Sequence, residues 1–414
     1  MADKIELHMF DKHIGDLYKE NDHIIMKQYD NGVHLASPLM IPKDQEYFDS
    51  TALTFIERVP GLISDSLPGS YGDAILNDFF EHNNNGKSPS VIDKLHFIGD
   101  RGIGALTFSP SNNPSAEEMQ TLNLKTMFEQ ARELKNGKKF TSLHEALLVS
   151  AHSFVGGARA KAVASINLAS KEVHLGHRNG FVPEGFIPAI IKYDDTEVGG
   201  KNKSLYSKLE YIYYLLAKES GIEMSDCYLL NAEDRHHFVA KRFDYVDGKR
   251  FHVHSLAGLL HKDYNIPMSL SYEELFETAR RLNASQSHKQ LFKQMIFNFL
   301  YVNQDDHSRN FSFMCDNNFQ WKATPAYDIT FAKGKKQTIE HQLTLYGKPL
   351  SKIGIDEIVR LGSKYEIDTK FMAETIEQMI ELRESKLDTY LKEYDISAEK
   401  RKQLMDEVSK RNFE

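Results

Sequence analysis

The sequence is poor in cysteine and has no long apolar run. Its 414 residues include two cysteines, Cys227 and Cys315, which excludes a disulfide framework and a zinc site built from several cysteines. No apolar stretch approaches the roughly 18 residues of a membrane span. The first residues, MADKIELH, carry charges where a signal peptide needs an apolar core. We therefore expect a soluble cytoplasmic protein with reduced thiols and no membrane partner.

An excess of positive charge is also lacking. Lys and Arg number 51 against 59 Asp and Glu, which gives a net charge of −8 and a pI near 6.1. This balance argues against a protein that wraps nucleic acid over a broad basic face, although a local basic patch stays open. A hydrophobic content of 41% and a charged content of 27% exclude global disorder. At about 150 residues per domain, the length predicts two or three domains.

The hydrophobic pattern divides the chain into three parts. Residues 1–110 begin with an alternating segment over 5–10 that predicts the start of a β-hairpin, and they form a β-rich subdomain. The linker-like stretch SPSNNPS at 109–115 marks the first boundary. Residues 111–245 are predicted to hold helices over 116–150, strands within 161–192, an amphipathic helix over 203–219 and a strand over 236–244. Residues 246–414 are predicted to be helical, with helices over 288–302, 371–391 and 397–413.

A glycine pair precedes the predicted strands of the central part. The stretch from Ser153 to Lys161 contains Gly156 and Gly157, followed by Arg159. Adjacent glycines let backbone N–H groups approach an anion closely, and the neighbouring Arg and Lys supply positive charge. The stretch is not a Walker A loop, because no Gly-Lys-Ser/Thr opens a helix there. Taken alone, it is better interpreted as a tight turn between a helix and a strand.

A lysine ends an apolar strand further along the chain. The segment AIIK, which ends at Lys192, is similar to the protein-kinase strand whose lysine reaches the nucleotide phosphates. Glu210, on the helix predicted over 203–219, is a candidate partner for Lys192 and equally a candidate for a solvated helix charge. Apolar strands that end in lysine are common, so this signal is weak in isolation.

The strongest signal is the segment from Asp305 to Asn310, DDHSRN. The distance from Asp305 to Asn310 matches the Asp-x₄-Asn spacing of the kinase catalytic loop. Phosphoryl transfer needs a carboxylate near the attacking hydroxyl and an amide oxygen on Mg²⁺. The spacing selects Asp305 over Asp306, and the preceding helix presents the segment as a loop. The competing interpretation is an Asp-rich helix C-terminus, because Asp and Asn favour turns.

A further carboxylate, Asp328, follows the predicted hairpin that returns from Asn310. It would be the second metal ligand. The order of glycine loop, strand lysine, helix glutamate, Asp-x₄-Asn and Asp is what an ATP-dependent kinase needs to assemble its site. The sequence therefore predicts ATP and Mg²⁺ as cofactors. The predicted fold class is α+β, in the form of a protein-kinase-like two-lobed fold with an extra N-terminal subdomain. In this prediction, residues 111–245 are the nucleotide-binding region and residues 246–414 are an all-helical C-terminal lobe.

With these residues in place, the chain resembles the HipA family of serine/threonine-kinase toxins over nearly its whole length. The two most specific similarities are the segments D-x-H-x-x-N-F-S at 305–312 and P-x-Y-D-I at 325–329. Weaker similarities lie at DSLPGSYG (65–72), IGDRGIGAL (98–106), residues 153–161, LAKESGI (216–222) and KRFD (241–244).

The resemblance implies roles for these residues. Asp305 would be the catalytic base, Asn310 and Asp328 would hold Mg²⁺, and His307 would brace the loop. Ser153 matches a loop serine that family members autophosphorylate. The cofactor-binding set implied by the resemblance is Ser153, Gly156, Gly157, Lys161, Lys192, Lys241, Arg242, Phe243, His307, Asn310 and Asp328, in which residues 241–243 would line the adenine hinge.

The resemblance also implies partners. Family members phosphorylate a serine of an aminoacyl-tRNA synthetase and pair with HipB, a small helix-turn-helix antitoxin that binds the operator. For this chain it implies a protein substrate and a HipB-like antitoxin, with operator DNA contacted mainly through that antitoxin. Arg159 stands where some family members have Gln. This departure leaves the protein substrate and the loop switch open.

Two alternatives stay open. One is a small-molecule or lipid kinase, since those folds also use Asp-x-His-x-x-Asn. The other is a catalytically idle binding module that only corepresses with its partner. A metal hydrolase is disfavoured, because His252 and His254, like His236 and His237, lack a matching carboxylate cluster in the sequence and are predicted to be exposed strand residues.

Overall fold

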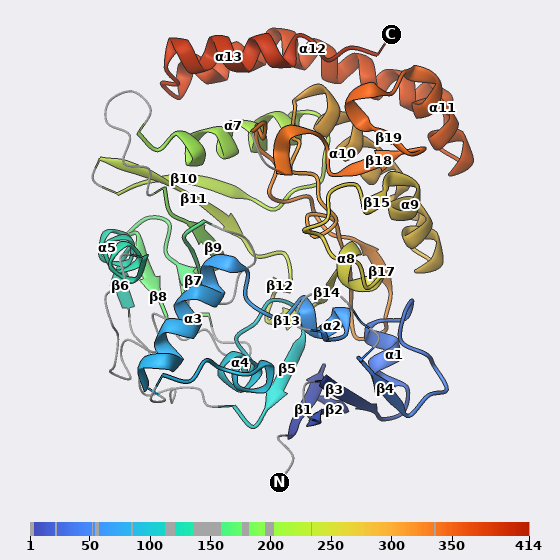
Figure 1. Cartoon of the computed structure of the whole chain (residues 1–414). Coiled ribbons are helices and arrows are strands. Elements are labelled where there is room, and N and C mark those ends of the chain that lie inside the picture. The colour runs from blue at the N-terminus through green and yellow to red at the C-terminus, as the bar shows by residue number, and fades with distance from the viewer. Residues whose placement is uncertain are drawn as a thin grey trace. The chain divides into compact units, whose positions relative to one another are not determined.

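The structure is a computed structural model that describes residues 4–20, 23–51, 53, 58–83, 86–111, 121–135, 159–175, 182–194, 203–232, 234–334 and 337–413. The chain forms two compact units. The first comprises Met1–Asp195 and Tyr228–His254, and the second Thr196–Cys227 and Ser255–Glu414. Figure 1 labels the elements in chain order. The three-part division of the sequence stays a prediction.

The first unit begins with a five-stranded antiparallel sheet in the order β4-β3-β2-β1-β5. The hairpin predicted near residue 5 is confirmed, and its alternation places Ile5, Leu7 and Met9 in the core. The strands of this sheet are β1 (Lys4–Met9), β2 (Lys12–Glu20), β3 (His23–Gln28), β4 (Tyr47–Asp49) and β5 (Leu106–Ser109). The helices between them are α1 (Gly32–Ala36), α2 (Gly61–Ser64), α3 (Ser70–Asn83) and α4 (Val91–Ile98).

A six-stranded sheet in the order β10-β11-β9-β7-β8-β6 follows. The strands predicted within 161–192 and over 236–244 are confirmed. The prediction of helix throughout 116–150 is wrong at 121–123, where a three-residue strand pairs with β8 and is too short to show a period of its own. The elements are β6 (Thr121–Asn123), α5 (Leu124–Lys135), β7 (Lys161–Ile166), β8 (Glu172–His174), β9 (Ile187–Lys192), β10 (Cys227–Ala232) and β11 (Arg235–Lys241). The short strands β12 (Tyr245–Val246), β13 (Lys249–Arg250) and β14 (His252–Ser255) come next.

A buried ion cluster ties the chain after β11 to the glycine-rich segment before β5. The Arg242 guanidinium donates to both carboxylate oxygens of Asp244, at 2.9 and 2.6 Å. Asp244 also accepts the N–H of Gly104 at 2.7 Å, and Arg250 donates to the carbonyl of Gly102 at 2.9 Å. Burial raises the pKa of Asp244, but Arg242 and these hydrogen bonds prevail and hold it below its ordinary value.

Three of the four histidines predicted to be exposed strand residues are buried instead, and the fourth, His236, is half-buried. His252 and His254 are 1% and 0% exposed, and His237 is also fully buried. His252 donates to the carbonyl of Ala36 at 2.9 Å, and His254 pairs with the Asp65 carboxylate at 2.6 Å. Burial, reinforced by the neighbouring His254, lowers the pKa of His252 to about 3. Ala36 and Asp65 lie 216 and 189 residues from their histidine partners, so no local pattern indicated the burial.

The second unit is mainly helical. Its helices are α7 (Leu205–Glu219), α8 (Leu256–Leu259), α9 (Tyr272–Arg281), α10 (His288–Leu300), α11 (Ile355–Lys364), α12 (Thr369–Glu393) and α13 (Ala398–Val408). The all-helical prediction is corrected by short strands: β15 (Leu270–Ser271), β16 (Ser312–Cys315), β17 (Trp321–Ala323), β18 (Leu343–Leu345) and β19 (Lys348–Pro349). Strands of two to four residues are too short to produce a detectable alternation. Among the described residues, no helix combines the length and apolar character needed to cross a membrane.

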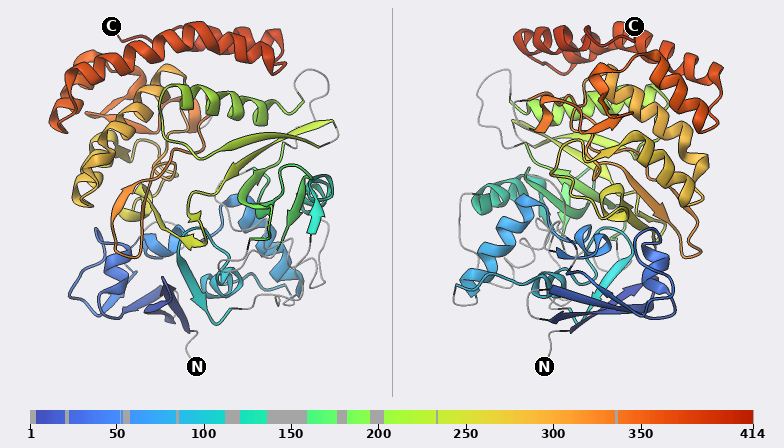
Figure 2. Two further views of the ribbon diagram at one scale, coloured as in Figure 1. Left: turned by 180° about the vertical axis from the view of Figure 1, so that it is seen from behind. Right: turned by 45° about the vertical axis from the view of Figure 1, so that its right-hand side comes forward.

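An aromatic core holds α7, α10 and α12 together. The rings of Phe297 and Tyr301 stack with centroids 4.0 Å apart, and the Tyr213 ring meets the Tyr301 ring edge-on at 6.1 Å. Tyr301 then donates its hydroxyl to the carbonyl of Met379 at 3.1 Å. Both views of Figure 2 show the green helix α7 running beside the red helix α12. This core fixes the C-terminal end of α10.

One buried hydrogen bond in this aromatic core allows its contribution to the stability of the fold to be measured. We expect Tyr213→Phe to lower the free energy of unfolding by about 1–2 kcal/mol, because the hydroxyl of Tyr213 donates to the carbonyl of Tyr301 at 2.7 Å in a fully buried setting. Tyr47→Phe, at a side chain that is 51% exposed, is the matched control. Urea unfolding of both variants measures the difference, and equal values would contradict the prediction.

Candidate functional site

Helix α10 ends directly before the segment that carries Asp305. The N–H groups of Val302 and Asn303 donate to the carbonyls of Phe299 and Asn298, at 3.4 and 2.9 Å, which is the Schellman pattern of helix termination. Val302 adopts φ +57° at the position that glycine usually occupies. For a β-branched residue this conformation costs about 1–3 kcal/mol. The backbone is therefore strained at Val302, where the loop begins, and the surrounding packing must hold this residue in its conformation.

Asp306 is the buried anchor of this loop. Its side chain is 1% exposed. One carboxylate oxygen accepts the hydroxyl of Tyr272 at 2.7 Å and the Nδ1 proton of His341 at 3.0 Å, and the other accepts the N–H of Gln342 at 2.7 Å. The sequence analysis missed Tyr272 and His341, because they lie more than 30 residues from Asp306 and have no local motif. With these three donors in place, Asp306 holds the loop and is closed to a substrate.

Asp305 differs from its neighbour in exposure. Its side chain is 42% exposed, and Nε2 of His307 lies 4.0 Å from one carboxylate oxygen. The backbone carbonyl of Asp305 accepts the side-chain amide of Asn310 at 2.8 Å. Of the two adjacent aspartates, the one that the spacing selected is therefore the one that solvent reaches. Its role as base stays a prediction.

Asn310 is oriented by its own loop. Its side-chain nitrogen donates to the carbonyl of Asp305, and its backbone N–H donates to the carbonyl of His307 at 2.8 Å. In this orientation the side-chain nitrogen of Asn310 is used in a hydrogen bond within the loop. The described residues provide no hydrogen-bond partner for its side-chain oxygen. Carboxylate and amide oxygens are the donors that Mg²⁺ prefers. The side chains of Asn310 and Asp328 therefore fit the predicted metal in kind.

The loop that carries Asp328 is tied to the loop that carries Asn310. The Tyr327 hydroxyl donates to the carbonyl of Arg309 at 2.7 Å and lies 2.6 Å from the hydroxyl of Ser312. Asp328 itself adopts φ +54°, a left-handed conformation that aspartate tolerates better than most residues. The structure thus brings the segments of the two predicted metal ligands together, with Tyr327 as the connection.

His307 lies at an aromatic contact beside the loop. Its ring centroid is 5.4 Å from that of Tyr264, and the Arg309 guanidinium stacks over the same Tyr264 ring at 5.2 Å. Nδ1 of His307 is buried and has no hydrogen-bond partner among the described residues. These contacts suit a residue that braces the loop, which stays a prediction. Sequence analysis gave no signal for Tyr264.

Two of the lysines predicted to bind the cofactor lie side by side in the first unit. Lys161 of β7 and Lys192 of β9 are direct cross-strand partners, so they share one face of the sheet. The Lys192 ammonium is 5.6 Å from the ring centroid of Phe238. Lys161 is 4% exposed, and the binding of a nucleotide by either lysine stays a prediction. Ser153, together with Gly156 and Gly157, lies outside the described residues.

The structure gives less support to the remaining predicted site residues. The Arg242 side chain is committed to Asp244, and its N–H donates to the carbonyl of Pro188 at 2.9 Å. Neither group is presented to a nucleotide, so a hinge contact by Arg242 rests on its carbonyl alone. Lys241 pairs with Ala189 at the end of β11, and the contact of Phe243 with a nucleotide stays a prediction. Glu210 is 7% exposed, which excludes its interpretation as a solvated helix charge.

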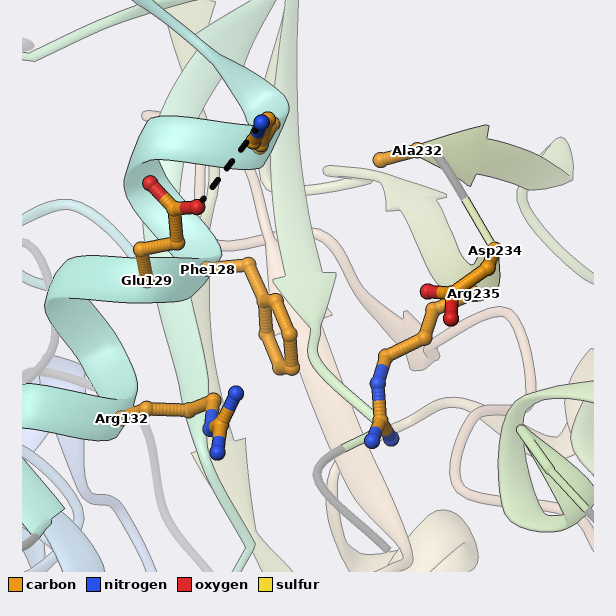
Figure 3. A pocket seen from close by; sticks show the side chains of 7 residues that line it. Phe128, Glu129, Arg132, Ala232, Asp234 and Arg235 are labelled. Carbon is orange, nitrogen blue, oxygen red and sulfur yellow. Dashed lines mark ion pairs between the residues drawn. The ribbon is translucent and has the colours of Figure 1, made fainter. Parts of the chain in front are cut away.

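A small cavity lies elsewhere in the first unit, between α5 and the adjoining ends of β10 and β11 (Figure 3). Its volume is about 170 Å³, below the roughly 300–1,000 Å³ of typical small-molecule sites. The guanidiniums of Arg132 and Arg235 flank the ring of Phe128 at 5.8 and 5.5 Å. None of the predicted site residues lines this cavity, so it contributes nothing to the candidate site.

Comparison with solved structures defines the class of fold. The chain is similar to HipA of Shewanella oneidensis MR-1, solved in a complex with HipB and its operator DNA, with a TM-score of 0.65 and 15% sequence identity over 98% of this chain and 95% of that chain. A Helicobacter pylori proinflammatory kinase, CtkA, matches with a TM-score of 0.33 and 13% identity over 60% of this chain and 94% of that chain; this match is too distant to support an argument. No curated protein matches. The chain thus has the HipA fold, which confirms the predicted mixture of helices and sheets, whereas the two-lobed kinase layout stays a prediction.

The family follows from the sequence itself. The family model of the HipA-like C-terminal domain matches residues 153–387, which is more than half of the chain and includes every predicted site residue. The chain therefore belongs to the HipA family, as the motifs at 305–312 and 325–329 indicated.

Proposed function

We propose that the chain is an ATP- and Mg²⁺-dependent serine/threonine protein kinase with the two-lobed layout of protein kinases. The observation that carries this proposal is the contrast at 305–306: Asp306 is buried under three hydrogen bonds, whereas the side chain of Asp305 is 42% exposed. Membership of the HipA family supports it. A loop anchored in this way holds one carboxylate rigidly and presents the other.

Each residue has a distinct task in the proposed reaction. Asp305 orients the attacking hydroxyl and accepts its proton. Asn310 and Asp328 hold Mg²⁺, which when bound neutralises charge on the phosphates. Lys161 and Lys192 bind the phosphate groups through their ammonium charges. The protein thereby contributes positioning and electrostatic stabilisation, the two main sources of rate in phosphoryl transfer.

The proposed biological role is that of the toxin in a toxin–antitoxin pair. The substrate would be a protein hydroxyl, with a serine of an aminoacyl-tRNA synthetase as the first candidate, and Ser153 would be the site of autophosphorylation. The solved HipA is in a complex with HipB and operator DNA, which supports a HipB-like helix-turn-helix antitoxin as partner. A net charge of −8 favours DNA contact mainly through that antitoxin.

Transfer of labelled γ-phosphate from Mg-ATP tests the activity. We expect label on the chain itself and on a protein acceptor. ATP consumption with small alcohols and no protein labelling would favour a small-molecule or lipid kinase. Absence of Mg-ATP binding in isothermal titration would favour an idle corepressor.

The role of Asn310 predicts a specific change in metal dependence. Asn310→Ala should raise the Mg²⁺ concentration needed for half-maximal phosphoryl transfer by at least about ten-fold, because one oxygen ligand is lost. Asn317→Ala, at an exposed turn residue of the same unit, is the matched control. A Mg²⁺ titration of the initial rate measures the shift. An unchanged midpoint in Asn310→Ala would show that this side chain does not hold the metal.

A further inference from the structure

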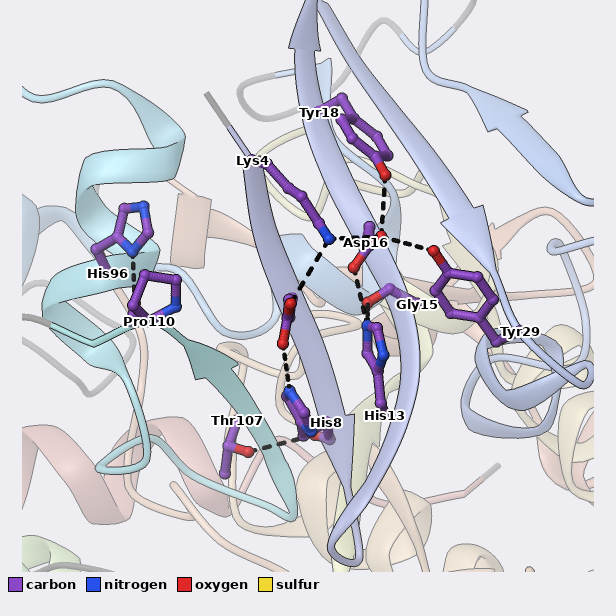
Figure 4. Close-up of polar contacts among 11 residues, drawn as sticks. Lys4, His8, His13, Gly15, Asp16, Tyr18, Tyr29, His96, Thr107 and Pro110 are labelled. Atoms are coloured by element: carbon purple, nitrogen blue, oxygen red, sulfur yellow. Dashed lines mark hydrogen bonds and ion pairs between the residues drawn. The ribbon is translucent and has the colours of Figure 1, made fainter. Parts of the chain in front are cut away.

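A cluster of imidazole and carboxylate groups lies on the outer face of the five-stranded sheet. In the sequence, these residues are distant from those of the candidate site. Glu6 and His8 are alternate residues of β1 and therefore share one face, whereas the intervening Leu7 points into the core. His13 of β2 is the direct cross-strand partner of His8, and their rings stack with centroids 5.0 Å apart. Figure 4 shows His8 and His13 on neighbouring strands.

A β-bulge adds a fourth group to this face. The register passes from Leu7 opposite Gly15 to His8 opposite His13, so β2 contains one extra residue there. In a regular strand, side chains three positions apart point to opposite faces. The bulge removes this offset and places His13 and Asp16 on the same face. The local irregularity is thus what assembles the cluster.

Asp16 fixes the histidine next to it. Its side chain is fully buried, and one oxygen accepts Nε2 of His13 at 2.8 Å. The other oxygen accepts the hydroxyls of Tyr29 and Tyr18 at 2.7 and 2.9 Å and lies 3.1 Å from the Lys4 ammonium. All of these groups donate to the carboxylate oxygens of Asp16, which accept. In this contact Nε2 of His13 is therefore the donor, and Nδ1 is the ring nitrogen that remains for another partner.

The geometry between Glu6 and His8 suits a shared ion. One oxygen of Glu6 lies 3.5 Å from the Lys4 ammonium, and the other lies 3.2 Å from Nε2 of His8. Two ligands of a tetrahedral zinc ion, each at about 2.0–2.1 Å, are separated by about 3.3 Å. One ligand atom from each of Glu6, His8 and His13 lies within 4.8 Å of the other two.

We propose that Glu6, His8 and His13 bind a divalent transition-metal ion of the Zn²⁺ class, with Asp16 as a positioning residue behind His13. Two imidazoles and a carboxylate are a donor set that suits zinc, copper and nickel, whereas Mg²⁺ prefers oxygen ligands alone. A carboxylate behind a ligating histidine fixes the ring and raises its basicity. The three ligand side chains are 29–38% exposed, which leaves further coordination positions to water or to a donor from another molecule.

Binding of Co²⁺ to the full-length protein tests the site, because cobalt reports its nitrogen and oxygen ligands through visible absorption. We expect one high-affinity Co²⁺ per chain that Zn²⁺ displaces. His8→Ala and His13→Ala should each weaken binding by at least about 100-fold, because a direct ligand contributes more than the 10–100-fold typical of an outer-shell partner. His82→Ala, at an exposed histidine of α3, should bind as the parent does.

Thermal unfolding gives a second readout. Zn²⁺ should raise the melting temperature of the parent and of His82→Ala, and leave that of His8→Ala and His13→Ala unchanged, because metal bound only to the folded state stabilises it. Equal Co²⁺ affinity in the parent and in His8→Ala would overturn the proposal, as would the absence of any high-affinity Co²⁺ spectrum. Asp16→Asn should weaken Co²⁺ binding by about 10–100-fold. If it lowers only the melting temperature of the metal-free protein, the positioning role is wrong.

Discussion

Asp305→Asn should lower the rate of γ-phosphate transfer by about 10²–10⁴-fold, the contribution expected from a general base, and should leave the melting temperature unchanged. An amide has the shape of the carboxylate but does not accept the hydroxyl proton. The side chain is 42% exposed, so neutralising it costs little stability. Phosphorylation of the chain and of a protein acceptor measures the rate, and circular dichroism measures the melting temperature.

The same substitution one residue later is the matched contrast. Asp306→Asn should lower the melting temperature strongly, because an amide nitrogen would face donors such as Tyr272 and His341 and leave buried groups unsatisfied. Asp305 would then be required for activity, and Asp306 for stability. A stable, inactive Asp306→Asn together with an active Asp305→Asn would reverse the assignment.

This pair of residues also shows which features of the candidate site could be predicted from the sequence. The Asp-x₄-Asn spacing selected Asp305, and the helix periodicity before it predicted α10, because both signals are local. The partners of Asp306 are not local: Tyr272 and His341 lie 34 and 35 residues away. A single sequence contains no information on which distant hydroxyl or imidazole donates to a buried carboxylate, so the anchoring of the loop is visible only in the structure.

The wrong predictions have the same origin. Long amphipathic helices such as α7 and α12 repeat their pattern over several turns and were predicted within a few residues, whereas β18 and β19 are too short to repeat anything. His254 was expected at the surface because its partner, Asp65, belongs to another segment. The cluster of Glu6, His8 and His13 depends on a bulge in β2, and a one-residue change in register has no signature in composition.

The second large effect concerns the ion cluster of the first unit. Asp244→Ala should lower the free energy of unfolding by about 3–5 kcal/mol, the cost of removing one partner from a buried ion pair. The substitution removes the carboxylate that accepts both hydrogen bonds of the Arg242 guanidinium, and it removes the acceptor of the Gly104 N–H. Burial, followed by the neighbouring Arg242, lowers the pKa of Arg250 to about 10, the direction expected where desolvation and a like charge disfavour a cation. Asp78→Ala, at an exposed residue of α3, is the control.

The pH dependence distinguishes loss of charge from loss of packing. The pKa of Asp244 is lower in the folded chain than its ordinary value, so its stabilising contribution is complete above the ordinary carboxyl pKa of about 3.9 and is lost as the pH falls through the folded-state value. The difference between parent and Asp244→Ala should therefore be constant from about pH 8 to pH 5 and shrink below about pH 4. Urea unfolding at a series of pH values measures it. A difference that persists unchanged in acid would mean that the side chain acts through its volume, because a protonated carboxyl no longer neutralises the two guanidiniums.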